Sequence, residues 1–172
     1  MAKKKFKVNI LSVDSIEQLK RDLIAYQKDL ETKIKLLCKR LADEGAEIAQ
    51  ANVVSLEAVF TGELFNSISS EQVEAGRDRA VFVVKASSEH AIYVEFGTGI
   101  VGAENPYPGE LPVVYGVGKH IRQLADGRYG WFYQRDGQWY FTEGMPSRPF
   151  MYMAGLDLRE RVHEVAKEIF DV

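Results

Sequence analysis

No other part of the sequence is as dense in specific residue choices as the stretch Ala91-Ile92-Tyr93-Val94-Glu95-Phe96-Gly97-Thr98-Gly99. Its first six residues alternate, with Ile92, Val94 and Phe96 on one side, which predicts a β-strand. The glycines that follow permit positive φ angles, so we expect the chain to turn there. Glu95 lies between aromatic residues next to this turn. This arrangement could be a catalytic corner, a ligand loop or a subunit contact. The rest of the sequence is needed to distinguish these three interpretations.

A hairpin is predicted immediately before this stretch. Ala80–Ala86 is a run of β-forming residues that follows a turn at Gly76-Arg77-Asp78, so residues 66–86 are expected to form an antiparallel hairpin. With Ala91–Gly99 as a third strand, we predict a β-meander over residues 61–99. Leu64 to Ile68 is expected to lead into its first strand.

A long amphipathic helix is predicted over residues 14–52, with Asp14 or Ser15 as its N-cap. Its apolar residues recur at steps of three or four and are Ile16, Leu19, Leu23, Tyr26, Leu30, Ile34, Leu37, Leu41 and Ile48. A rod of about 50 Å, at 1.5 Å per residue, exceeds what a small domain needs to cover its own sheet. We therefore expect a break near Tyr26–Asp29 or near Gly45, or a helix that projects to meet another subunit.

Residues 100–145 are predicted to hold a loop rich in proline and glycine and then an aromatic hairpin around Asp136-Gly137. A two-stranded ribbon cannot bury that many aromatic side chains on itself, so we expect them to pack against the domain or against a partner. The candidate interface residues are Trp131, Phe132, Tyr133, Trp139, Tyr140 and Phe141. A base-stacking platform is the alternative, although only Arg128 and Arg135 are nearby to hold phosphates.

The predicted fold class is α+β, in a single domain over residues 1–172. A basic arm (1–13) precedes the long helix, and a C-terminal helix over residues 147–171 begins at Arg148-Pro149-Phe150, because proline suits a first helical turn. Both helices are expected to pack on the meander. The 172 residues, 46% of them hydrophobic, are enough for one such core and too few for two ordinary domains.

The composition excludes several kinds of partner. With 22 Lys plus Arg against 25 Asp plus Glu, the chain has no overall attraction to nucleic acid or to an anionic membrane, which favours protein partners and argues against sequence-specific nucleic-acid binding. No apolar run reaches the roughly 18 residues that a membrane span needs, and Met1–Lys5 is not followed by an apolar signal region. The single Cys38 cannot form an internal disulfide, which fits a reducing, aqueous compartment.

An enzyme is the competing hypothesis. The candidates for a metal site or an acid–base pair are His90, Glu95, His120 and His163. No two of them have a helical i, i+4 spacing, and none lies in a recognised ligand motif. The candidate nucleophiles Ser67, Ser87 and Ser147 lack the sequence context of a nucleophile elbow. We therefore predict no catalytic residue, no metal and no cofactor.

Three motifs, in this order, resemble the tail-completion or neck proteins of long-tailed bacteriophages, the minor head–tail joining family. They are Thr61-Gly62-Glu63-Leu64 with Ser67-Ile68, the stretch Ala91–Gly99, and Arg148-Pro149-Phe150-Met151 followed by Ala154. With the flanking helices they cover most of the chain. The sequence departs from the family in the longer and more aromatic insertion between Gly99 and Pro146.

The resemblance implies a structural protein rather than an enzyme, namely a subunit that completes the tail end at the neck so that a filled head and a tail can dock. Its partners would be other phage neck and tail proteins, with a homo-oligomer formed on assembly. The location implied is the virion, and the bacterial host cytoplasm during assembly. The alternative is a tail terminator or head-closure ring subunit of a phage or prophage.

A structural corner is the site that we expect. It comprises Tyr93, Glu95, Phe96, Gly97, Thr98 and Gly99, together with Thr61, Gly62, Arg148, Pro149 and Phe150. Glu95 is expected to accept hydrogen bonds from backbone N–H groups of the following loop, or to pair with Arg148, and so to fix where the last helix begins. An exposed strand position is the alternative for Glu95.

Overall fold

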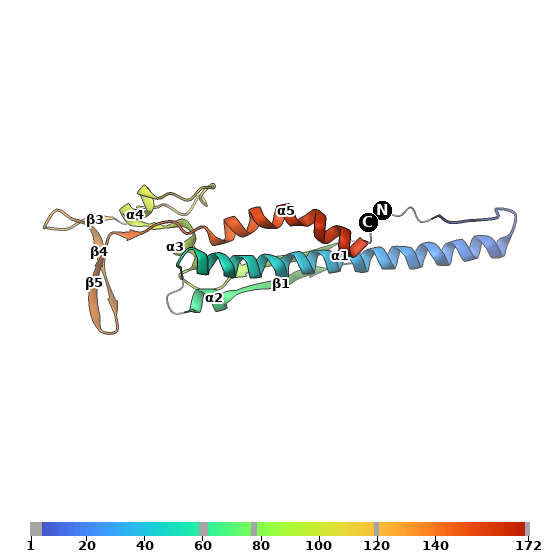
Figure 1. Cartoon of the computed structure of the whole chain (residues 1–172), viewed down its shortest axis with the longest axis horizontal. Helices are drawn as coiled ribbons and strands as arrows, with labels where there is room; N and C mark the ends of the chain where they lie inside the picture. The colour runs from blue at the N-terminus through green and yellow to red at the C-terminus, as the bar shows by residue number, and fades with distance from the viewer. Residues whose placement is uncertain (1–4, 59–61, 77–78, 119–120, 171–172) are drawn as a thin grey trace.

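The computed structural model describes residues 5–58, 62–76, 79–118 and 121–170 of an elongated molecule (Figure 1). Helix α1 (Val13–Ser55) runs along most of its length. The C-terminal helix α5 (Phe150–Phe170) packs along one side of the second half of α1, and a hairpin of β1 (Ile68–Ala75) and β2 (Ala80–Ala86) packs along another. The predicted α+β fold class is confirmed.

Helix α1 is unbroken over its 43 residues, so neither expected break is present. Its N-cap is Ser12, whose hydroxyl accepts a hydrogen bond from the Ser15 N–H at 3.3 Å. Gly45 lies inside the helix, where an added Cβ would be 3.2 Å from both Leu158 of α5 and Val84 of β2. This glycine permits close packing of three elements. The N-terminal half of α1 instead projects beyond the rest of the fold (Figure 1).

The core lies where α1, α5 and the β1–β2 hairpin meet. The buried residues of α1 are mostly small and are Ala42, Gly45, Ala46, Ala49, Asn52 and Val53. No residue of α1 before Ala42 is buried, so most of the predicted apolar stripe lies outside the core. Hydrophobic periodicity located the helix correctly, but it did not locate the buried face, because alanine and glycine add little to that signal.

The sheet beside α1 has two strands and not three. The predicted hairpin is confirmed, with β1 and β2 antiparallel from the pair Ile68–Ala86 onward and a register shift between Gln72 and Glu74. Two residues of its predicted turn, Arg77 and Asp78, lie outside the described residues. Residues Glu63–Ser67 form the short helix α2, and this helix leads directly into β1 at Ile68, as expected for Leu64 to Ile68.

Residues Ala91–Phe96, which we predicted as the third strand, form the short helix α3. Helical spacing turns Ala91, Val94 and Glu95 inward and leaves Ile92 and Tyr93 exposed. The meander predicted over residues 61–99 is therefore wrong in its last strand. Six residues are too few for strand alternation to be distinguished from a helical period.

The segment after α3 contains more regular structure than a loop. Helix α4 (Gly99–Glu104) is followed by irregular chain and then by a three-stranded antiparallel sheet of β3 (Arg122–Gln123), β4 (Tyr129–Arg135) and β5 (Gln138–Thr142). The short strand β6 (Gly144–Met145) leads into α5. The predicted aromatic hairpin is confirmed as β4–β5. It lies at the end of the molecule opposite the free end of α1 (Figure 1).

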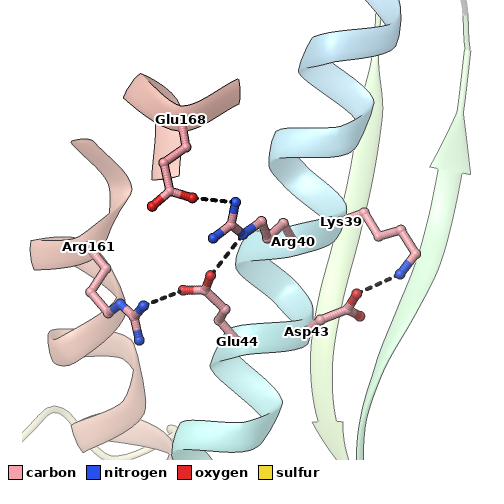
Figure 2. A network of polar contacts seen from close by, with 6 residues as sticks. All are labelled: Lys39, Arg40, Asp43, Glu44, Arg161 and Glu168. Carbon is pink, nitrogen blue, oxygen red and sulfur yellow. Dashed lines mark hydrogen bonds and ion pairs between the residues drawn. The ribbon is translucent and has the colours of Figure 1, made fainter. Parts of the chain in front are cut away.

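A charged network joins α1 to the last turns of α5 (Figure 2). The Glu44 carboxylate lies 3.1 Å from Nε of Arg40 and 3.2 Å from Nη2 of Arg161, and Nη1 of Arg40 lies 2.6 Å from Glu168. Glu44 is the centre of this network, and only 15% of its side chain is exposed. Lys39 and Asp43 form a separate pair on the sheet side of α1 (Figure 2).

We expect Glu44→Gln to lower the free energy of unfolding by about 1–2 kcal/mol. The glutamine amide carries no charge, so it cannot form ion pairs with the two guanidinium groups that folding has partly removed from water. Urea unfolding followed by circular dichroism measures the loss. Glu47→Gln, an exposed position of the same helix, is the matched control and should stay within about 0.5 kcal/mol of the parent. Equal losses in the two variants would contradict the role given to the network.

Candidate functional site

The carboxylate of Glu95 caps the N-terminus of α5. Its Oε2 accepts a hydrogen bond from the Met151 N–H at 2.9 Å, and its Oε1 accepts one from the Tyr152 N–H at 3.0 Å. These N–H groups belong to the first turn of α5, where no intrahelical acceptor exists for them. Glu95 is 6% exposed, so it is not an exposed strand residue. Its backbone donors belong to α5 itself, and the Tyr107 side chain, from the segment after Gly97, forms a further hydrogen bond with it.

Burial raises the pKa of Glu95 above its ordinary value of 4.5, and the hydrogen bonds from Met151 and Tyr152 oppose this shift in part. Because the folded protein holds this proton more tightly than the unfolded chain does, folding takes up a proton at pH values between the two pKa values. The contribution of Glu95 to stability is therefore fully present below the pKa of the unfolded chain and declines as the pH rises through the folded pKa.

This pKa shift predicts a specific pH dependence. The difference in unfolding free energy between the parent protein and Glu95→Gln should shrink as the pH rises from below 4.5 toward neutrality, because only the parent titrates at this position. Urea unfolding of both proteins at a series of pH values measures the difference, and all other carboxylates cancel. A difference that grows with pH would show that the helix N-terminus outweighs burial at Glu95.

The backbone around Glu95 is joined to the segment that enters α5. The Arg148 N–H donates to the Val94 carbonyl at 2.8 Å, and the Ser147 hydroxyl donates to the Glu95 carbonyl at 2.6 Å. The Phe150 side chain is fully buried, and its carbonyl accepts a hydrogen bond from the buried Asn52 of α1 at 3.1 Å. α3, α1 and the start of α5 are thus held to one another through backbone groups.

The turn after α3 is joined to β6, the strand that leaves the aromatic hairpin. Thr98 and Gly99 form isolated bridges with Met145 and Gly144, and the Ile100 N–H donates to the Glu143 carbonyl at 2.9 Å. Gly99 has φ of 67°, and a Cβ at this residue would be 2.1 Å from the Glu143 carbonyl oxygen. No side chain fits there. The exit strand of the hairpin therefore lies directly against the Gly97-Thr98-Gly99 turn.

We refer to these contacts of residues 95–99 with residues 143–152 as the joint. Aromatic rings pack against it. The Phe96 ring lies 4.8 Å from that of Tyr107 and 5.0 Å from that of Tyr115, measured between centroids, and Tyr107 lies 5.4 Å from Tyr152. The Tyr115 hydroxyl donates to the Gly97 carbonyl at 2.6 Å. Burial raises the pKa of Tyr107, and the charge of Glu95 adds to the shift. These tyrosines fix the irregular segment to the turn.

The remaining residues of the expected corner have different positions. Tyr93 is exposed and lines a groove of about 550 Å³ with Thr98, Gly99, residues 114–118, Ile121, Arg122 and Trp131. Pro149 lies just before α5, where its carbonyl accepts from the Met153 N–H at 3.0 Å. Gly62 precedes α2 with φ of 77°, and Thr61 lies outside the described residues. The structure thus gathers Glu95 to Gly99 with residues 144–152, while Gly62 serves a separate turn.

The aromatic hairpin β4–β5 is paired in register and largely exposed. Phe132 lies opposite Phe141 and Tyr133 opposite Tyr140, with ring centroids 5.4 and 5.7 Å apart. Trp139 is 67% exposed, and Phe132, Tyr133 and Tyr140 are exposed as well. The turn residues Asp136 and Gly137 both have positive φ, as a two-residue type I′ turn requires. The hairpin therefore presents an aromatic surface that the chain itself does not cover.

Two of the three described arginines beside this hairpin, Arg128 and Arg135, have partners in the chain, and the third, Arg122, lies on β3 opposite Gly130 of β4. Arg128 pairs with Asp126 at 2.7 Å, and its guanidinium carbon lies 4.4 Å from the centre of the Phe141 ring. Arg135 lies 3.4 Å from the carboxylate of Asp136. A base-stacking surface needs cations directed at phosphates. Arg128 and Arg135 are instead paired with carboxylates of the chain itself.

Chemistry-bearing side chains are dispersed over the described ranges. No group of three or more His, Cys, Asp or Glu side chains in these ranges could hold a metal ion. His90 and His163 are exposed on α3 and α5 respectively, and His120 lies outside the described residues. Within the same ranges, no helix has the length and apolar character to cross a membrane.

Several members of the joint had no clear signal in the sequence. Asn52 continues the predicted helical stripe as a polar residue, which was the one available sign that it meets a buried backbone group. Tyr107, Tyr115 and Ser147 lie in irregular segments, where periodicity gives no information about contacts.

The fold and the joint define an α+β protein whose most elaborate site is architectural: one glutamate and a glycine turn hold a helix, a short helical corner and a projecting hairpin together. A protein-family model matches part of the chain. Residues 21–97 match the family model described as "Bacteriophage HK97-gp10, putative tail-component". This confirms the resemblance to a phage tail-component family over a little under half of the chain, including the stretch Ala91–Gly97.

The match ends before the aromatic hairpin and α5. The Arg148-Pro149-Phe150 motif and the candidate interface therefore lie outside the residues that the family model covers. No curated protein and no solved structure matches the chain.

Proposed function

We propose that this protein is a structural subunit of the phage neck, which completes the tail end and allows head and tail to join during virion assembly. It acts by binding other neck and tail proteins and catalyses no reaction. The single observation that carries the proposal is the match of residues 21–97 to a phage tail-component family. The order of the three sequence motifs supports the finer assignment to the neck.

The joint gives this proposal a physical basis. A docking subunit has to present a binding surface at a fixed angle, because ordering a loose surface costs binding free energy. Here the exposed aromatic hairpin is connected to the helical body through β6, which is bridged to Thr98 and Gly99. Exposed aromatic residues are the commonest anchors of protein interfaces. We propose the hairpin as the surface that binds a neighbouring neck or tail protein.

Deletion of the gene from the phage genome tests the proposal. Electron microscopy of the lysate should show filled heads beside complete but unattached tails. Overlong tails would indicate the alternative of a tail terminator, and leaking heads would indicate a head-closure subunit. Normal infectious particles would contradict all three assignments.

Complementation of that deletion tests the hairpin separately. Trp139→Ser should fold normally but reduce the yield of joined particles by at least about tenfold, since truncation of an aromatic anchor typically costs 2 kcal/mol or more of binding. Val113→Ser is the control, because Val113 is also exposed and apolar but lies outside the hairpin. Full complementation by Trp139→Ser together with Phe132→Ser would show that the hairpin is not the docking surface.

A further inference from the structure

The projecting half of α1 carries an apolar stripe that the rest of the chain covers only in part, by the Phe6 ring at Tyr26 and by Arg79 and Ala80 beside Leu30 and Ile34. Its members are Ile16, Leu19, Leu23, Tyr26, Leu30, Ile34 and Leu37. None of them is buried, and Ile16 and Ile34, near its two ends, are 48% and 43% exposed. A monomeric protein rarely exposes a continuous apolar surface of this length, so the stripe indicates an interface.

The stripe is the continuation of the face on which α5 packs. Further along α1, residues at the same helical spacing meet α5: Glu44 pairs with Arg161, Gly45 contacts Leu158, and Asn52 bonds to Phe150. α5 runs antiparallel to α1 and ends beside Arg40, to which Glu168 is paired (Figures 1 and 2). From that point to Val13, no described helix packs on this face of α1, and the N-terminal arm runs back beside it with Phe6 against Tyr26 (Figure 1).

The stripe is symmetric about a point between Tyr26 and Gln27. Ile16 and Leu37 lie equally far from this point on either side, as do Leu19 and Ile34, and Leu23 and Leu30. A second copy of α1 placed antiparallel about the same point therefore brings apolar residues opposite apolar residues along the whole stripe. Interfaces between two identical copies are commonly built on this kind of two-fold self-match.

The charges beside the stripe fit the same arrangement. At 100° per residue, Lys20 and Glu31 lie on one flank of the stripe, and Asp22 and Lys33 lie on the other. A two-fold axis places like flanks of two antiparallel helices together, so Lys20 comes opposite Glu31 of the second copy, and Asp22 opposite Lys33 of the second copy. Each pair has opposite signs and occurs twice.

We infer that two copies of this chain associate through the projecting halves of α1, packed antiparallel about Tyr26. The parallel arrangement is excluded sterically, because a straight second α1 in parallel register would occupy the space that α5 fills from Arg40 onward. In the antiparallel arrangement, Val13 of the second copy lies opposite Arg40, and its helix occupies the face where α5 ends. This self-association is separate from the proposed neck function and does not depend on it.

The N-terminal arm has to move aside for this contact. The Phe6 ring packs against Tyr26 with 6.0 Å between centroids, at the middle of the stripe. The neighbouring arm residues Val8, Ile10 and Leu11 are exposed, so these three side chains contribute little to holding the arm in place. A second helix buries more of the stripe than this ring does.

Sedimentation equilibrium of the purified full chain tests the inference. The parent protein should have twice the mass of one chain, and Leu23→Glu should weaken the dimer at least about tenfold, because it places a charge in the apolar contact of both copies. Ile24→Glu is the matched control. Its side chain is 58% exposed, against 46% for Leu23, but it points away from the stripe, so the dimer should persist. A monomer at about 100 µM, or equal effects of the two substitutions, would overturn the inference.

Cross-linking tests the orientation independently of affinity. In a Cys38→Ser background, Tyr26→Cys should form a disulfide between copies, as should an equal mixture of Ile16→Cys and Leu37→Cys chains. Ile16→Cys alone should not, because its two sulfurs would lie about 30 Å apart along the antiparallel pair. Efficient self-linking of Ile16→Cys would show parallel packing and overturn the model. Circular dichroism of each variant confirms that the helices remain folded.

Discussion

Glu95→Ala is expected to lower the free energy of unfolding by about 3–5 kcal/mol, a large part of the stability of a domain of this size. The substitution removes both acceptors of the first turn of α5 and leaves the Met151 and Tyr152 N–H groups without partners beside the fully buried Phe150. A buried donor without a partner costs about 1–3 kcal/mol, and the lost carboxylate leaves a cavity. Urea unfolding followed by circular dichroism at 222 nm measures the change.

Glu89→Ala is the control for this prediction, because Glu89 is an exposed glutamate just before α3. It should change the free energy of unfolding by less than about 0.5 kcal/mol. Glu95→Gln should fall between the two, since its amide keeps one acceptor oxygen but directs a donor at the second N–H. A loss below about 1 kcal/mol in Glu95→Ala would mean that the cap is not what holds α5 to α3.

Gly99→Ala is expected to detach the aromatic hairpin from the body. Its Cβ would lie 2.1 Å from the Glu143 carbonyl oxygen, and φ of 67° is unfavourable for a residue with a side chain. The bridge to Gly144 then has to open, at a cost of about 3 kcal/mol or more, because a positive φ and a backbone displacement add to each other. Both tryptophans of the chain, Trp131 and Trp139, lie in this hairpin, so their fluorescence reports its unfolding.

Gly127→Ala separates the two contributions. Gly127 also has a positive φ, 87°, but nothing lies within 4 Å of where its Cβ would be. Its alanine variant should therefore carry only the cost of the backbone conformation, about 1 kcal/mol. If the tryptophan transition shifts equally in the two variants, close packing of Gly99 against Glu143 is not what holds the hairpin to the turn.

Sequence reasoning located the elements with strong local signals. The helix that carries the long stripe, the β1–β2 hairpin with its β-branched run, and the aromatic hairpin around Asp136-Gly137 are all present. Neither short helix was predicted, for one physical reason. Ala91–Phe96 and Glu63–Ser67 are short, so their conformation is decided by the elements they pack against and not by a period that the sequence can display.

The site was accessible to sequence reasoning only in part. Glu95 was expected to accept hydrogen bonds from the loop that follows it or to pair with Arg148, but its carboxylate accepts from the N–H groups of Met151 and Tyr152, more than 50 residues further along the chain. Thr98 and Gly99 also bridge to the strand Gly144–Met145, which lies far from them in sequence. Such contacts depend on tertiary packing, and the local patterns of a single sequence do not indicate them.

We have proposed that this chain is a subunit of the phage neck, where head and tail are connected. Antibodies raised against the purified chain and labelled with gold, applied to intact virions and to free tails in the electron microscope, test it most directly. We expect label at the head-proximal end of free tails and, where accessible, at the neck of whole particles. Label at the distal tail tip, or along the tail shaft, would contradict it.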